Sequence, residues 1–236
     1  MAYTHATEYG TIALHLQPTD CTGMTQTALK KKRSYGPDVL LIRLEGRSLV
    51  EKTYRNKGLP VRVMGTLLVS WEAFIYSRLM GICGIPVVTS RPDKYTLVTS
   101  YMGGENLRST TRRPGVTYFE KLSSIIEQMH QRGVVHLDLR NRRNYGIDTS
   151  GLPYLVDFAT CAYVPWPGRL RDILATIDWM GFLKIKERLN PEEITNEERR
   201  RLAKGRTMSN LWLPGRATKP IRDMITYLKK SFLGSA

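Results

Sequence analysis

The chain has 236 residues, a formal net charge of +15 and a hydrophobic fraction of 42%. Its length allows one good core or two small lobes that share a cleft, and its composition excludes a disordered or low-complexity protein. The longest apolar runs fall far short of the roughly 20 residues that cross a bilayer, and residues 1–10 lack a basic segment followed by an apolar stretch. We therefore expect a cytoplasmic protein without a transmembrane helix or a secretory signal.

The beginning of the chain predicts an arm followed by a β-hairpin. Residues 1–36 have no clear periodicity, and we expect an arm or an irregular cap there. The run VLLIRLEGRSLVEKTY then predicts strands at about 38–44 and 47–54. Gly46 marks the tight turn between them, because glycine tolerates the positive φ that such a turn needs.

A helix and a second pair of strands are expected next. After a break at 58–60, apolar side chains at helical spacing predict an amphipathic helix over 70–80. Residues 85–88 and 95–101 are rich in β-branched side chains and predict a second strand pair. We thus expect a small β-rich region over residues 37–101.

The rest of the chain, residues 102–236, is expected to form a mainly helical C-lobe. Two glycines after Met102 break the sheet, and apolar spacing predicts a helix over 117–132. Short strands are predicted at 145–147 and 154–156. Further helices are predicted over 170–188, 191–203 and 219–232.

The net charge favours anionic partners but does not choose among them. Nucleic acid, an anionic membrane or glycolipid surface, and phosphate-rich substrates including ATP all remain open. No nucleic-acid-binding signature accompanies the basic clusters, so no specific nucleic acid is expected. Cys21, Cys83 and Cys161 lie far apart without zinc or disulfide spacing, which fits a reducing compartment.

Residues 129–159 hold the chemically informative motif, MHQRGVVHLDLRNRRNYGIDTSGLPYLVDFA. Phosphoryl transfer needs one carboxylate that accepts or orients the acceptor hydroxyl group. It also needs a second carboxylate and an amide oxygen that hold Mg²⁺ against the phosphates. Asp138, Asp157 and Asn144 provide this set.

The order of HLDL, Asn and Asp-Phe resembles the catalytic loop and DFG region of protein-kinase-like enzymes, over residues 50–181. The resemblance implies an α+β bilobal fold, with a small antiparallel β-rich N-lobe over residues 37–101 that holds the nucleotide and a mainly helical C-lobe over residues 102–236. It implies ATP and Mg²⁺ as well. It also implies Asp138 as the catalytic base, Asn144 and Asp157 as metal ligands, and His136 as a structural residue that ties the loop to the core.

Kinases of this kind also use a strand lysine on the α- and β-phosphates and a helix glutamate that holds it. Lys52 and Glu72 match these two positions. Taken singly, each is more often an exposed surface residue. Their order and their distance from the glycine break favour the functional interpretation.

The same resemblance implies where adenine binds. Backbone groups from Ser100 to Met102 would receive the base, and Val50 and Leu97 would contact it through apolar side chains. Residues 100–104 would form the hinge between the two lobes.

The chain departs from the kinase pattern at several points. Asn144 follows Asp138 by six positions instead of about five, so either the loop bulges or Arg143 takes the expected place, with Asn141 as a weaker alternative ligand. The first hairpin has no glycine-rich phosphate loop. Ala159 replaces the DFG glycine, and the segment that follows is too short for a phosphorylated activation loop.

These departures resemble compact bacterial relatives, namely lipopolysaccharide-core sugar kinases and RIO-like kinases. Residues 177–202 are also similar to the C-terminal helices of the sugar kinases. Arg140 stands where many such kinases place a lysine that contacts the transferred phosphate. Asp178 matches the buried aspartate that braces the catalytic loop, although a plain surface aspartate is an equal alternative.

We therefore expect an ATP-dependent kinase whose anionic acceptor is a protein serine or threonine or a phosphorylated glycolipid. A sugar kinase would use its basic face to contact the inner membrane peripherally. A pseudokinase that binds partners without chemistry is the alternative, supported by the stretched loop and the absent glycine-rich loop.

Overall fold

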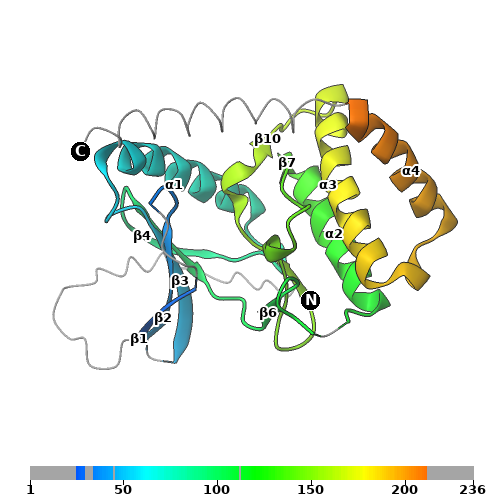
Figure 1. Ribbon diagram of the computed structural model, residues 1–236. Helices are drawn as coiled ribbons and strands as arrows, with labels where there is room; N and C mark the ends of the chain where they lie inside the picture. Colours follow the sequence, from blue (N-terminus) through cyan, green and yellow to red (C-terminus); the bar gives the residue numbers. More distant parts are fainter. Residues whose placement is uncertain (1–24, 30–33, 45, 112, 212–236) are drawn as a thin grey trace, which may run out of the picture.

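The computed structural model describes residues 25–29, 34–44, 46–111 and 113–211. They form an antiparallel sheet with one long helix against it, joined to a mainly helical part (Figure 1). Most of the predicted arm and the predicted helix over 219–232 lie outside the described residues. No described helix is long and apolar enough to cross a membrane.

The described residues of the N-lobe form a five-stranded antiparallel sheet in the order β1-β2-β3-β5-β4. Lys52 pairs with Val39 on one neighbouring strand and with Leu97 on the other, so the central strand carries it. The strand at the start of the sheet corrects the prediction of an irregular arm throughout 1–36. The strands are β1 (Thr25–Ala28), β2 (Asp38–Leu44), β3 (Arg47–Thr53), β4 (Val88–Asp93) and β5 (Thr96–Ser100).

The helix α1 (Leu59–Leu79) is longer than the sequence predicted, because it begins at Leu59 and not at residue 70. The break read at 58–60 is a helix start, since Pro60 lies in the first turn, where a missing backbone N–H costs nothing. Gly65 lets the helix approach the sheet closely: a Cβ there would lie 2.3 Å from the ring of Tyr54.

The second strand pair is also shifted relative to the prediction. Ile85 and Pro86 are buried beside the sheet, and β4 runs instead from Val88 to Asp93. Pro92 lies within β4. This is compatible with its place because β4 is an edge strand, where one side needs no ladder hydrogen bond.

The C-lobe is built on α2 (Val116–Gln131), α3 (Arg169–Leu189) and α4 (Asn196–Leu211). A helix predicted over 191–203 is in fact a 3₁₀ turn, Pro191–Glu193, followed by α4. Thr195 and Glu198 explain the new start, since each side chain accepts a hydrogen bond from the other's backbone N–H, at 3.1 and 2.9 Å, in a capping box. The short strands are β6 (Glu105–Asn106), β7 (Val134–Val135), β8 (Tyr145–Ile147), β9 (Pro153–Leu155) and β10 (Ala162–Tyr163).

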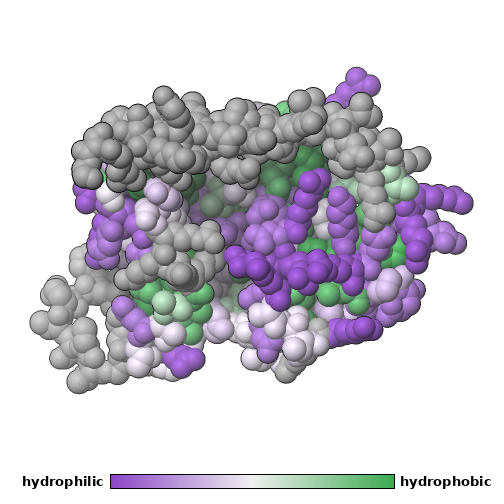
Figure 2. Space-filling model, viewed as in Figure 1, coloured by the Kyte–Doolittle hydropathy of each residue, from purple (hydrophilic) through white to green (hydrophobic). Residues whose placement is uncertain are grey.

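One hydrophobic core joins the two lobes. Ile75 and Leu79 of α1 belong to it together with Ile126 and Met129 of α2, and it also includes Phe158, which has no exposed surface. Hydrophilic side chains dominate the outer face seen in Figure 2, with apolar patches between them. The core therefore anchors Phe158, which directly follows Asp157 of the predicted site.

Candidate active site

A cavity of about 360 Å³ lies between the sheet and the C-lobe. All four residues predicted to contact adenine line it: Val50, Leu97, Ser100 and Met102. The predicted phosphate-binding pair and one predicted metal ligand line it too, namely Lys52, Glu72 and Asp157. Residues from the two lobes, distant in sequence, thus meet at one cavity.

Lys52 joins two carboxylates at this cavity. Its Nζ donates to both carboxylate oxygens of Glu72, at 2.8 and 2.7 Å, and to Oδ1 of Asp157, at 2.9 Å. Burial alone would lower the pKa of Lys52, but the charges of Glu72 and Asp157 outweigh it and raise the pKa. Lys52 is therefore a fixed cation at neutral pH, and α1 and Asp157 are both tied to the central strand.

The backbone around Asp157 directs its carboxylate to Lys52. Asp157 has φ 71°, a left-handed conformation that is uncommon for residues other than glycine. It opens a 3₁₀ turn in which the buried ring of Phe158 packs against Tyr76 and His136, with centroids 5.1 and 5.0 Å apart. The anchored phenyl ring holds the strained turn, and a strained position of this kind is typical of a functional site.

The loop from His136 to Asp138 is held from below by Asp178. This carboxylate has no exposed surface, and it accepts hydrogen bonds from the backbone N–H groups of His136 and Leu137, at 2.7 and 2.8 Å. Leu137 also has a positive φ, 64°, which the two hydrogen bonds fix. The surface alternative for Asp178 is thus wrong, and its position in α3 is that of a loop brace.

Asp178 has a further partner that sequence reasoning missed. Nε2 of His130, on α2, lies 3.0 Å from Oδ2 of Asp178. Taken alone, a histidine in a helix is most often a surface residue. Nothing in the spacing links the two positions, since they lie 48 residues apart and meet only when α2 packs on α3.

The stretched loop brings Asn144 back to Asp138. The side-chain amide of Asn144 donates to the backbone carbonyl oxygen of Asp138 at 3.0 Å and to its Oδ2 at 2.9 Å. The extra residue is accommodated by a 3₁₀ turn, Arg142–Asn144, whose N-cap is Asn141. Asn141 lies farther away, 3.4 Å from the same Oδ2. Arg143 lines the cavity and does not take the place of Asn144.

The Asp138 and Asn144 pair is attached to the strand that leads to Asp157. The backbone N–H of Val156 donates to the carbonyl oxygen of Asn144 at 3.0 Å, and Nε2 of His136 lies 3.2 Å from the carbonyl oxygen of Val156. The two carboxylates therefore come from neighbouring backbone segments. Asp138, Asn144 and Arg140 do not line the cavity itself, and the Arg140 side chain is exposed.

Gly181, on the same helix as Asp178, is a second position that supports the loop. A Cβ there would lie 2.7 Å from the carbonyl carbon of Leu139, so α3 touches the loop backbone directly. Its spacing of three residues after Asp178 places both on the same helix face. Tyr145 adds a hydrogen bond from its hydroxyl to the Leu139 carbonyl oxygen, at 2.6 Å.

The donor set fits a magnesium ion that a nucleotide shares. Mg²⁺ usually takes one or two protein oxygen ligands and completes its shell with phosphates and water. Because the NH₂ group of Asn144 donates to Asp138, the ligand on offer there is the amide oxygen, which is a hard donor like the Asp157 carboxylate. Among the described residues, no group of three or more His, Cys, Asp or Glu side chains forms a metal site by itself.

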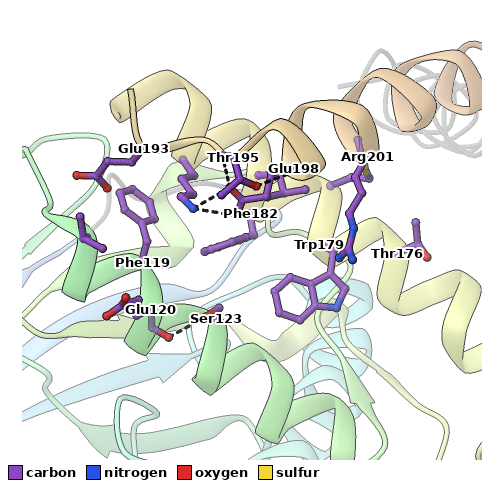
Figure 3. Close-up of a pocket in the computed structure, with 14 residues that line it drawn as sticks. Phe119, Glu120, Ser123, Thr176, Trp179, Phe182, Glu193, Thr195, Glu198 and Arg201 are labelled. Carbon is purple, nitrogen blue, oxygen red and sulfur yellow. Dashed lines mark hydrogen bonds and ion pairs between the residues drawn. The ribbon is translucent and has the colours of Figure 1, made fainter. Parts of the chain in front are cut away.

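A second and larger cavity, of about 580 Å³, lies away from these residues between α2, α3 and α4. Figure 3 shows the rings of Phe119, Trp179 and Phe182 on its helical wall, with Glu198 and Arg201 on α4. It contains none of the predicted site residues. The charged pair within it, Lys186 and Glu198, joins α3 to α4 at 2.8 Å.

The chain is similar in structure to Rio2 kinase from Chaetomium thermophilum. One solved structure, a complex with ADP, Mg²⁺ and phosphoaspartate, matches with a TM-score of 0.56 and 16% identity over 71% of this chain and 57% of that chain. Another matches with a TM-score of 0.53 and 17% identity over 66% and 55%. The chain thus spans little more than half of the length of these kinases. No protein-family model and no curated protein sequence matches it. At this level of identity the likeness establishes the fold: the chain has a protein-kinase-like fold of the Rio2 type.

Proposed function

We propose that the chain is an ATP-dependent phosphotransferase that transfers the γ-phosphate of ATP to a hydroxyl group. One observation carries the proposal: Lys52 contacts Glu72 of the N-lobe and Asp157 of the C-lobe at the wall of one cavity. A buried lysine between two carboxylates is the arrangement that a kinase uses on the α- and β-phosphates. The Rio2 complex with ADP and Mg²⁺ has the same fold and supports this assignment.

In this proposal the cavity receives the nucleotide. Val50 and Leu97 contact the adenine ring, and backbone groups from Ser100 to Met102 hydrogen-bond to its edge. Lys52 then lies at the phosphates. The lining residues and the cavity volume of about 360 Å³ support it, since nucleotide-sized ligands occupy cavities of this class.

Three residues have roles in the catalytic step. Asp157 and the amide oxygen of Asn144 would hold Mg²⁺, which neutralises charge on the phosphate oxygens when it is bound. Asp138 accepts the proton of the acceptor hydroxyl as the new bond between oxygen and the γ-phosphorus forms. The bond from that phosphorus to the bridging oxygen breaks, and ADP leaves. Asn144 positions the Asp138 carboxylate through its hydrogen bond of 2.9 Å.

The acceptor is proposed to be anionic, either a protein with a serine or threonine hydroxyl or a phosphorylated sugar of the lipopolysaccharide core. Arg140 and Arg143 have exposed side chains on the same loop as Asp138, and they support an acceptor with negative charge next to the reacting hydroxyl. The lipopolysaccharide alternative, with peripheral contact to the inner membrane, rests on sequence resemblance and charge alone.

Magnesium-dependent nucleotide binding and phosphate transfer test the proposal. We expect ATP to raise the melting temperature only when Mg²⁺ is present, and radiolabelled γ-phosphate to reach casein or a phosphorylated core oligosaccharide. Asp157→Ala should abolish both effects. Binding without transfer to either acceptor would favour the pseudokinase alternative. The absence of binding in the wild-type chain would contradict the proposal.

A further inference from the structure

The outer face of α1 exposes a row of large apolar side chains. Four of these side chains are between 57% and 65% exposed, namely Leu59, Val63, Met64 and Leu67. Trp71 continues the row and is 36% exposed. The opposite face of the same helix is buried in the core. A helix that is apolar on both faces is normally covered on both, and exposed apolar surface of this extent marks an interaction site.

The apolar surface continues from α1 toward the start of α3. Nε1 of Trp71 donates to the carbonyl oxygen of Cys161 at 3.0 Å, and the ring of Phe74 packs against Tyr163 on β10 with centroids 5.2 Å apart. The chain then reaches α3 with further exposed apolar side chains, at Trp166 (76%) and Leu170 (61%).

The described chain ends close to this surface. The α3 and α4 helices are joined by a short turn, and Lys186 contacts Glu198 across them. Helices joined in this way run antiparallel, so α4 returns toward the first turns of α3, as Figure 1 also shows. Leu211, the last described residue, therefore lies at the end of the C-lobe at which α3 begins and Leu170 is exposed.

The sequence beyond Leu211 contains a segment that matches the exposed face. In KPIRDMITYLKKSF, residues 219–232, the apolar side chains of one helical stripe are Ile221, Met224, Ile225, Leu228 and Phe232. At 1.5 Å per residue this stripe would be about 17 Å long, against about 18 Å for the row from Leu59 to Trp71. The nine residues from 212 to 220 span up to about 30 Å when extended.

We propose that residues 219–232 form an amphipathic helix that packs along the outer face of α1. Burial of both stripes removes the exposed apolar surface from water, and it holds α1 between the core and the C-terminal segment. Because α1 carries Glu72, the segment would stabilise the position from which Glu72 holds Lys52. The C-terminal segment is thereby a brace for the nucleotide-binding lobe, and it does not depend on the proposed chemistry.

Hydrogen exchange on the full-length chain tests the proposal without nucleotide. We expect amides in 221–232 to exchange at least tenfold more slowly than in a synthetic peptide of that sequence. Leu67→Glu should remove this protection, because it places a charge in the row. Val116→Glu is the matched control, since it alters a side chain of similar exposure, 53% against 62%, on α2. Deletion of 212–236 should speed exchange in α1 and leave α2 unchanged.

Other occupants of the face give distinct results. Protection of 221–232 that is equal in the wild-type chain and in Leu67→Glu would overturn the proposal. Protection of α1 that rises with protein concentration would assign the face to a second copy. Protection of α1 that arises only with phosphatidylglycerol vesicles would assign it to a membrane surface. Each of the last two results would also contradict the proposal.

Discussion

Asn144 donates its side-chain amide to both the backbone carbonyl oxygen and the carboxylate of Asp138, at 3.0 and 2.9 Å. The two residues are six positions apart, one more than the usual kinase spacing of about five. The 3₁₀ turn over Arg142–Asn144 absorbs the additional residue. The stretched loop therefore keeps the contact between the proposed base and the proposed metal ligand.

Substitution of the proposed base should abolish chemistry and leave the fold intact. In Asp138→Asn, the new amide oxygen still accepts the hydrogen bond from Asn144, so the loop keeps its shape. The side chain can no longer accept the hydroxyl proton, and phosphate transfer should fall by about 10² to 10⁴-fold. Single-turnover transfer from ATP measures the loss. Asp172→Asn, an exposed carboxylate on α3, is the control, and equal rates for the two variants would contradict the role of Asp138.

Removal of the Lys52 amine should destabilise the protein and stop nucleotide binding. Lys52→Met leaves the buried carboxylate of Glu72 without its cation, which costs about 3–5 kcal/mol. The double variant Lys52→Met with Glu72→Met should regain stability in urea unfolding without regaining binding to Mg-ATP.

Lys57 provides the matched control for Lys52. It also forms a buried ion pair in the N-lobe, with Asp38 at 2.6 Å and side-chain exposures of 8% and 7%. Lys57→Met should lower the free energy of unfolding by a similar amount, yet it should bind Mg-ATP below its melting temperature. Loss of binding in both variants would indicate general destabilisation in place of a phosphate contact at Lys52.

A single methyl group added at Gly181, where α3 touches the catalytic loop, should lower both stability and activity. In Gly181→Ala the new Cβ would meet the backbone of Leu139 and Arg140, at 2.7 to 3.0 Å, and backbone atoms cannot rotate away. We expect a loss of about 1–3 kcal/mol in the free energy of unfolding, and a larger fractional loss in kcat than in nucleotide affinity. Gly36→Ala, where nothing lies within 4 Å, should change neither quantity.

Much of the candidate site could be predicted because its polar residues follow one another along the chain in the order of the kinase motifs. The chemistry of phosphoryl transfer selected Asp138, Asn144 and Asp157, and the resemblance to kinases selected Lys52 and Glu72. The structure brings Lys52 together with Glu72 and Asp157. The residues that support them depend on packing between distant segments, and a single sequence does not contain that information. His130 illustrates this limit, because an ordinary helical histidine reaches Asp178 only through the way in which α2 lies on α3.

The errors in the fold have local causes. Gly58 and Pro60 predicted a break, although proline in the first turn also starts a helix. The helix that starts there packs Gly65 closely on Tyr54. Pro92 is typical of a turn, but an edge strand such as β4 also tolerates it. In both cases the same residue type is compatible with two local structures, and tertiary contacts select one.

The junction of α3 and α4 should weaken in acid. Burial raises the pKa of Glu198, but hydrogen bonds and charge from Lys186 and Thr195 outweigh it, so the pKa in the folded chain lies below its ordinary value of 4.5. A carboxyl group whose pKa is lowered by folding stabilises the protein above its unfolded pKa, and this contribution is lost as the pH falls through the folded value.

Glu198→Gln should therefore cost about 1 kcal/mol of unfolding free energy at pH 7. The difference in unfolding free energy from the wild-type chain should shrink below pH 4.5. Urea unfolding between pH 3 and pH 7, followed by tryptophan fluorescence because Trp179 lines the same cavity, measures both values. A difference that stays constant across this range would mean that the ion pair with Lys186 contributes nothing to the junction.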